Sequence, residues 1–377
     1  MTRNPKYIRT LEKIPQFSQK EKDRLKPVCD KFAMRANTYY LSLIDWDDPN
    51  DPIRRIILPD VGELKEWGQL DPSNEKAYTK VPGLEHKYEY TALLLVNHMC
   101  GGFCRFCFRK RIFMENNDET VTDIGPAIDY IRNHKKITNI LLTGGDPLLL
   151  STNRLENIIR QLREIDHVQI IRIGSKMIAF NPFRVLNDEG LVKMIEKYST
   201  KDKKIYIMAH FNHPAELTEY SKSAINMLHK AGAMIVNQTP LIKGVNDDPD
   251  VLSELFRILS YMGVPPYYVF QCRPTLGNLT YSVRLEKAYE IFEQARMRTS
   301  GLGKRARFVM SHNSGKIEIV GKTENLVFMR YHRAADPSQK SKFMVVRSNP
   351  TAYWFDDYKE LVDEYNVKNP FLKISAA

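Results

Sequence analysis

Three cysteines, Cys100, Cys104 and Cys107, lie within one short segment and could bind iron or zinc. Their spacing, C-x3-C-x2-C, lets three thiolates reach three irons of one cubane cluster and leaves the fourth iron without a protein ligand. Zinc normally takes a fourth Cys or His, or keeps an open catalytic position, and His98 lies only two residues before Cys100. We therefore favour a [4Fe–4S] cluster. A zinc site and unliganded thiols are the alternatives.

The cysteine segment follows the first of seven short apolar runs, which predict buried strands. Helical patterns lie between most of these runs, such as the apolar spacing of Leu155, Ile158, Ile159 and Leu162. Strands that alternate with helices indicate a parallel sheet in an open or closed α/β barrel. Functional residues of such folds gather at the carboxyl ends of the strands. The seven predicted strands are Ala92–Asn97, Asn139–Thr143, Val168–Gly174, Lys204–Phe211, Met234–Thr239, Tyr267–Cys272 and Ala306–Ser311.

Three parts are expected along the chain. Residues 1–88 form a polar, irregularly patterned N-terminal extension with a short helix-like piece at Gly62–Leu70. Residues 89–320 form the core barrel, and a second helical pattern in it comprises Leu285, Ala288, Tyr289 and Phe292. Residues 321–377 form a C-terminal extension.

The composition is that of an ordinary globular protein, with a formal net charge of +11. This charge suggests an anionic partner, and a well-solvated surface is the alternative. No apolar run approaches the ~20 residues of a membrane span, and the N-terminus lacks a hydrophobic signal core, so we expect a cytoplasmic protein. The five cysteines are too few and too unevenly spaced to indicate a disulfide framework.

The cysteine spacing after a first strand resembles that of the radical S-adenosylmethionine (SAM) superfamily. The resemblance implies that SAM binds the open iron and that one electron cleaves it to a radical, which abstracts a substrate hydrogen. The second strand ends in Gly144, Gly145 and Asp146. Glycines there would let the backbone approach the SAM amino group. By itself such a sequence is more often only a turn.

A longer resemblance, from about Tyr39 to Met344, is to the lysine 2,3-aminomutase family. It implies the partial (β/α) barrel of that family and SAM contacts from Ser175, His210 and Gln238. The stretches that carry it include Tyr40–Asp45, Val81–Tyr88, Ile171–Lys176, His210–Pro214, Asn237–Thr239 and Pro266–Cys272.

In this family the substrate amino acid is joined to pyridoxal phosphate (PLP), and its nitrogen moves between Cα and Cβ. The resemblance assigns Lys316 as the lysine that holds PLP, with Lys87 and Tyr88 as basic and aromatic contacts. A lysine in this role must be partly desolvated so that its amine is nucleophilic. The chain departs from the family in two places, because only Gly315 remains of a glycine run and Thr91 replaces a phosphate-binding arginine. The alternative is a turn lysine in a relative without PLP.

Two arginines bear on the expected substrate. The resemblance implies that Arg109 binds the substrate α-carboxylate, a planar anion that suits its forked donors. Arg273 and Ser311 stand where lysine-using members carry aspartates. A cation and a hydroxyl there predict an anionic or neutral polar substrate, such as a glutamate-like amino acid, rather than lysine. The alternative is that Arg273 is only a surface arginine.

The first interpretation is therefore a radical SAM amino-acid 2,3-aminomutase on a non-lysine substrate. We keep three alternatives: a PLP-independent radical SAM mutase or epimerase, a modifier of protein or RNA, and a non-enzymatic iron–sulfur or zinc protein. The expected partners are a small amino-acid substrate, an electron donor such as flavodoxin or ferredoxin, and a second copy of the chain.

Overall fold

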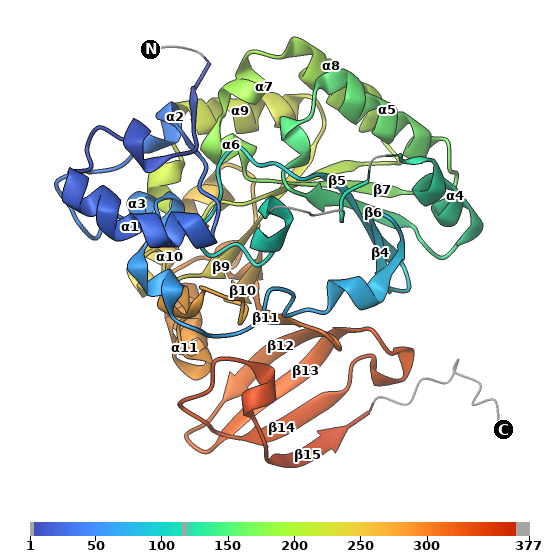
Figure 1. Cartoon of the computed structure of the whole chain (residues 1–377). Coiled ribbons are helices and arrows are strands. Elements are labelled where there is room, and N and C mark those ends of the chain that lie inside the picture. The colour runs from blue at the N-terminus through green and yellow to red at the C-terminus, as the bar shows by residue number, and fades with distance from the viewer. Residues whose placement is uncertain (1–3, 115–118, 122, 367–377) are drawn as a thin grey trace.

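A computed structural model describes residues 4–114, 119–121 and 123–366 of the chain. Its central feature is one curved sheet, flanked by helices on its outer side (Figure 1). Within the described residues this sheet has 13 strands in the order β15-β14-β13-β12-β11-β10-β9-β8-β7-β6-β5-β4-β3, and it does not close into a complete barrel. The chain therefore has the α/β fold and the open barrel that its sequence predicts.

The middle of the sheet consists of seven described strands, from β5 to β11, and each pairs in parallel with its neighbour. Each one overlaps one of the seven apolar runs, so the predicted strands are confirmed. Their bounds are β5 (Thr91–Asn97), β6 (Asn139–Gly144), β7 (Ile170–Ser175), β8 (Ile205–Ala209), β9 (Met234–Leu241), β10 (Pro266–Gln271) and β11 (Arg307–His312).

Helices connect the successive parallel strands, as parallel pairing requires. The two predicted helical patterns lie in α5 and α11, which confirms them. The hydroxyl of Ser151 caps α5 by accepting from the Arg154 N–H. The connecting helices are α4 (Gly125–Asn133), α5 (Thr152–Arg163), α6 (Met177–Phe180), α7 (Phe183–Leu186), α8 (Glu189–Tyr198), α9 (Glu219–Lys230), α10 (Pro249–Tyr261) and α11 (Leu285–Met297).

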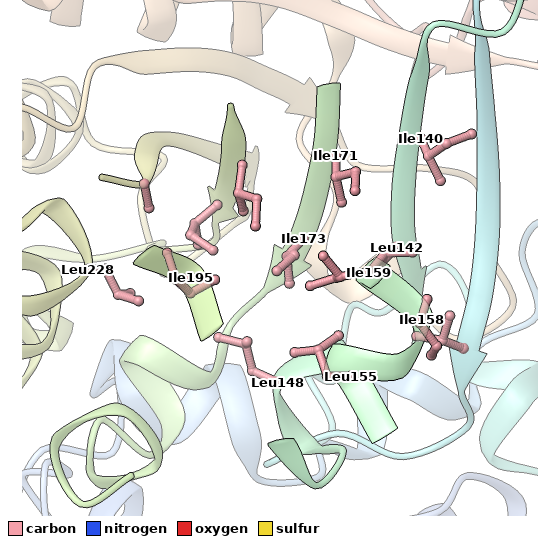
Figure 2. Close-up of a cluster of buried hydrophobic side chains, with 14 of the residues drawn as sticks. Ile140, Leu142, Leu148, Leu155, Ile158, Ile159, Ile171, Ile173, Ile195 and Leu228 are labelled. Carbon is pink, nitrogen blue, oxygen red and sulfur yellow. The ribbon is translucent and has the colours of Figure 1, made fainter. Parts of the chain in front are cut away.

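The alternation of side chains along the strands separates a packed core from the concave face. Figure 2 shows Ile140 and Leu142 of β6 beside Ile171 and Ile173 of β7, with helix residues such as Ile159 packed against them. All five side chains are fully buried. The intervening strand residues point the other way and line a cavity, among them Leu141, Thr143, Arg172 and Gly174.

Antiparallel strands extend the sheet at both edges. β3 (Thr79–Val81) and β4 (Leu84–Tyr88) precede β5, while β12 (Gly315–Lys322), β13 (Leu326–Ala334), β14 (Phe343–Arg347) and β15 (Leu361–Tyr365) follow β11. The latter four lie at the bottom of Figure 1. The expected boundary at 320/321 falls inside β12, and the boundary at 88/89 falls at the end of β4. The division into three parts stays a prediction.

The N-terminal extension is more regular than its sequence suggests. It contains β1 (Tyr7–Ile8), α1 (Gln19–Lys31), β2 (Ala36–Asn37), α2 (Thr38–Leu41) and α3 (Pro52–Ile57). The expected helical piece at Gly62–Leu70 is mostly wrong, because only a 3-10 helix over Val61–Leu64 forms there. Helix α1 was not predicted because it lacks a clear apolar periodicity. It buries only Leu25 and Val28, and it contains Pro27. Its sequence signal is instead a capping box at Ser18.

None of the helices in the described ranges combines the length and apolar character that a membrane-spanning segment needs.

The buried face of β7 should dominate the stability of the barrel core. Ile173→Ala should lower the free energy of unfolding by about 2–5 kcal/mol, because it removes packed methylene groups and leaves a cavity. Met234→Ala, at a half-exposed position of β9, should change it by less than about 0.5 kcal/mol. Urea unfolding followed by circular dichroism measures both values, and equal effects would contradict this account of the core.

Candidate active site

The concave face of the sheet, the cysteine segment and the antiparallel strands enclose one cavity of about 310 Å³. This volume lies at the lower end of the range of roughly 300–1,000 Å³ that is typical of small-molecule sites. All of the site residues predicted from the sequence line it, namely Lys87, Tyr88, Cys100, Cys104, Cys107, Arg109, Gly144, Gly145, Asp146, Ser175, His210, Gln238, Arg273 and Lys316.

The three cysteines lie in a loop, residues 98–109, that has no helix or strand of its own. Backbone hydrogen bonds from the N-terminal extension hold this cysteine loop. The Phe103 N–H donates to the Arg35 carbonyl at 2.8 Å, and the Arg105 N–H donates to the Ile56 carbonyl at 2.9 Å. The Asn37 amide donates to the Gly101 carbonyl at 3.1 Å. The loop geometry is therefore set by residues that precede the barrel.

A buried ion pair completes this attachment. Arg105 of the cysteine loop donates Nε and Nη2 to the two carboxylate oxygens of Glu63 at 2.9 and 2.8 Å, and both side chains are almost fully buried. The Tyr281 hydroxyl donates to the same carboxylate at 3.0 Å. Removing one partner of such a pair leaves an uncompensated buried charge and costs roughly 3–5 kcal/mol.

The thiols of the cysteine loop are enclosed by protein. Burial raises the pKa of the Cys104 thiol to about 12 and also raises the pKa values of Cys100 and Cys107. Thiols in such surroundings stay protonated unless a metal replaces the proton. Within the described ranges no three His, Cys, Asp or Glu side chains are grouped to hold a metal ion. The observation that agrees with an iron–sulfur cluster is that all three thiols line the same cavity.

The paired glycines at the end of β6 are required by close backbone packing. Gly144 has φ +105°, and a Cβ atom there would lie 2.5 Å from the Asn97 carbonyl oxygen. A Cβ atom on Gly145 would lie 2.3 Å from the Met99 carbonyl oxygen. The glycines thus let the end of β6 approach the backbone that leads into the cysteine loop. The Asp146 N–H donates to the Met99 carbonyl at 2.8 Å and continues this contact.

Two of the expected SAM contacts bind each other. The Ser175 hydroxyl donates to Asp146 Oδ2 at 3.0 Å, and the Lys176 N–H donates to the same oxygen at 2.7 Å. Asp146 therefore joins the ends of β6 and β7. His210 is neutral, because burial and then the Lys176 charge lower its pKa well below the ordinary value. The Gln238 amide makes no hydrogen bond to another described residue and faces the cavity.

Lys316 lies near the start of β12, just after the turn between β11 and β12, and lines the same cavity. Its Nζ atom lies 4.0 Å from the ring centre of Tyr268 and 4.8 Å from that of Phe270. Burial lowers its pKa well below the ordinary value, and the charges of Arg333 and Arg172 lower it further. No described carboxylate forms an ion pair with it. Its surroundings therefore favour the uncharged, nucleophilic form of the amine.

Arg109 has an internal partner that the sequence did not reveal. Its Nε and Nη2 donate to both carboxylate oxygens of Glu75 at 2.8 Å, and its Nη1 donates to the Thr143 hydroxyl at 3.0 Å. Arg273 is less fully bound, because only its Nη1 donates, to the Ser73 hydroxyl at 2.8 Å. The Arg273 guanidinium also stacks on Phe108 at 3.6 Å.

Similarity to known proteins places this site in a family. Residues 94–255 match the family model described as the radical SAM superfamily. The chain is 56% identical to a putative L-lysine 2,3-aminomutase of Aquifex aeolicus over 97% of its own length and 98% of that protein. The chain belongs to the lysine 2,3-aminomutase family.

Other members of this family confirm the assignment. The chain is 40% identical to the L-lysine 2,3-aminomutase of Clostridium subterminale over 78% of its length and 71% of that protein. It is 37% identical to the glutamate 2,3-aminomutase of Clostridioides difficile over 78% of its length and 69% of that protein. The chain is thus a radical SAM enzyme, an isomerase of the aminomutase kind. The family implies a [4Fe–4S] cluster and SAM, and the three cavity-lining cysteines fit the cluster.

Several residues at the site of this aminomutase were missed by sequence reasoning. Glu75 and Glu85 come from a segment without clear periodicity, and Arg172 and Arg333 look like exposed members of alternating strands. A weak signal existed for Arg172, because it interrupts an apolar strand at an inward position. Nothing local marks Arg333, which reaches the cavity only because β13 pairs with β12.

The contact between Gly145 and the cysteine loop can be tested. Gly145→Ala should displace the loop and sharply reduce the iron bound after anaerobic reconstitution, because the added methyl group would clash with the Met99 carbonyl. Gly174→Ala is the matched control, since its Cβ atom would meet neighbours only at 3.5 Å or more. Iron and sulfide assays with circular dichroism measure the effect. Full iron content in Gly145→Ala would show that the packing is unimportant.

Proposed function

We propose that the enzyme converts an α-amino acid to its β-isomer with PLP attached through Lys316. The observation that carries this proposal is the buried Lys316 amine, which forms no ion pair with a described carboxylate and lies in the same cavity as the three cysteines. Burying a charged lysine without an acidic partner costs free energy, so burial favours the neutral amine. A neutral amine can react with a carbonyl group. The names of the family members that act on lysine and glutamate agree with this reaction class.

The walls around Lys316 suit an aromatic cofactor. Tyr268 and Phe270 lie beneath its amine, and Tyr88 and Lys87 line the same cavity. Burial, and then the Arg273 charge, lower the pKa of Lys87 to about 8. PLP, when bound, supplies a conjugated ring that stabilises an unpaired electron near the migrating nitrogen. The cluster and SAM supply the radical that removes a substrate hydrogen.

Arg273 is the better candidate for binding a substrate carboxylate. Arg109, which family resemblance favoured, already uses its three guanidinium nitrogens for Glu75 and Thr143. The Nε and Nη2 atoms of Arg273 have no hydrogen-bond partner among the described residues, and its side chain lines the cavity. A carboxylate can accept two parallel bonds from such a fork. Arg109 then acts by fixing Glu75 beside this position.

The same region offers little to a substrate ammonium group. Although burial alone would raise it, the Arg109 charge, followed by Arg273 and Arg111, holds the pKa of Glu75 below its ordinary value. Its negative charge is thus shared by three arginines. Burial and then the charge of Glu75 raise the pKa of Glu85 to about 8, so this residue is mostly neutral at pH 7. We therefore propose a glutamate-like or other polar substrate rather than lysine.

The proposal extends to the partners of the enzyme. Cleavage of SAM needs one electron, and a small donor such as a flavodoxin or ferredoxin would supply it. An acidic donor would suit the formal net charge of +11. A cytoplasmic location and a homo-oligomer remain predictions. The enclosed, cation-rich cavity favours a small anionic substrate over a protein or RNA substrate.

PLP attachment can be tested directly. Adding PLP to the purified protein should give a visible absorbance band distinct from that of the cluster, and borohydride reduction should fix the pyridoxyl group on the peptide that contains Lys316. Lys316→Ala should abolish both signals. Lys322→Ala is the control, because Lys322 lies on the same strand but pairs with Glu286 and Glu290 outside the cavity. Labelling of another lysine in the unmodified chain would disprove the assignment.

Substrate preference can be tested with an amino-acid panel. The enzyme, incubated anaerobically with SAM, reductant and PLP, should isomerise a glutamate-like acid in preference to lysine, as mass spectrometry would show. Arg273→Met should reduce kcat/KM for that acid by roughly tenfold or more, since a hydrogen bond to a charged group contributes about 1.5–3 kcal/mol. Arg307→Met, on a partly exposed pair with Glu318, should have no effect. Equal losses in both variants would remove this role from Arg273.

A further inference from the structure

A buried arginine of the N-terminal extension has donors that no described residue satisfies. Arg35 immediately precedes β2 and is only 5% exposed. Its guanidinium carbon lies 4.0 Å from the centre of the Tyr7 ring, which belongs to β1. Two of its guanidinium nitrogens, Nε and Nη1, are buried and have no hydrogen-bond partner among the described residues. Buried donors of a charged group are costly when they remain unpaired, so a missing acceptor is expected here.

The backbone around Arg35 holds it beside the cysteine loop. The Arg35 carbonyl accepts from the Phe103 N–H at 2.8 Å, and the Asn37 amide donates to the Gly101 carbonyl at 3.1 Å. Burial raises the pKa of the Cys100 thiol, whereas the positive charge of Arg35 acts in the opposite direction. The guanidinium therefore lies within electrostatic reach of the Cys100 sulfur.

The cations near the other two cysteines already have hydrogen-bond partners. Burial raises the pKa of both thiols, and among the groups that oppose it are Lys176 for Cys104 and Lys110 for Cys107. The Lys176 ammonium donates to three oxygen atoms. The Lys110 ammonium donates to a backbone carbonyl at 3.0 Å. Arg35 differs from both lysines, because it carries a buried charge and keeps unpaired donors next to a thiol.

An iron–sulfur cluster supplies the kind of acceptor that Arg35 lacks. Once iron replaces the thiol proton, the cysteine sulfur carries negative charge and accepts hydrogen bonds. Net charge and hydrogen bonds to the sulfur atoms are among the factors that set the reduction potential of such a cluster. Because reduction adds one negative charge, a nearby cation stabilises the reduced state more than the oxidised state.

We propose that the Arg35 guanidinium donates to the Cys100 sulfur when the cluster is bound, and that this contact raises the reduction potential of the cluster. The inference goes beyond the proposed function, because it concerns electron uptake and holds with or without PLP. Arg35 lies outside the set of residues that line the cavity. It therefore acts on the cluster through a cysteine ligand, without contacting the substrate. The Tyr7 ring covers one face of its guanidinium, so β1 also supports this contact.

The test measures the midpoint potential of the cluster in the reconstituted protein without SAM, by a redox titration followed by electron paramagnetic resonance. Arg35→Met removes the charge and the donors but keeps the backbone bond to Phe103, so the iron content should stay normal. The reduction equilibrium should shift about tenfold toward the oxidised cluster, which lowers the potential by about 59 mV for one electron. Arg54→Met is the matched control, because Arg54 also stacks on an aromatic ring of the extension but pairs with Glu21. Its potential should equal that of the unmodified protein.

An unchanged potential in Arg35→Met with full iron content would overturn the inference. If this variant loses its iron, Arg35→Lys and Arg35→Gln are compared instead, because lysine keeps the positive charge and glutamine keeps only neutral donors. The potential should then be higher in Arg35→Lys, and equal potentials would reject the electrostatic role. Loss of iron from all three variants would reject it too, since Arg35 would then have a structural role. An unmodified protein that binds no iron would reject the inference together with the cluster site.

Discussion

The buried ion pair between Glu63 and Arg105 anchors the cysteine loop, which has no secondary structure of its own to fix its conformation. The cysteine loop has neither helix nor strand, so the positions of its thiols depend on bonds to other parts of the chain. Glu63 binds the side chain of Arg105, and the carbonyls of Arg35 and Ile56 bind the loop backbone. On the other side, Gly145 brings the end of β6 against Met99. The cysteine loop thus lies between the N-terminal extension and the barrel.

Charge is distributed unevenly around the cavity. Near the cysteines, Glu75 is bound by Arg109 and Arg111 and compensates part of the positive charge. Near Lys316, the cations have only neutral oxygen partners among the described residues. Burial at the Lys316 end lowers the pKa of the amine. The same low-dielectric surroundings strengthen the interactions of the nearby arginines with any charged group.

Local sequence patterns predicted the barrel strands and the three cysteines, whereas the other predicted site residues came mainly from the family resemblance. The seven apolar runs could be read because buried parallel strands are nearly continuous in apolar residues, and the cysteines because their spacing is distinctive. The hydrogen-bond partners of Arg109 could not be predicted from the sequence. Glu75 lies 34 positions before Arg109 in a polar segment, and only the folded chain brings the two side chains together. Helix α1 was missed because its packing surface consists of only two buried apolar side chains.

The order of the anchors along the chain bears on how the protein is assembled. Arg35, Asn37, Ile56 and Glu63 all leave the ribosome before the cysteines that they hold, whereas Tyr281 and the strands that carry Arg273 and Lys316 emerge much later. The complete cavity can therefore form only after the strands that carry Arg273 and Lys316 have been synthesised, long after the three thiols and the residues that hold their loop.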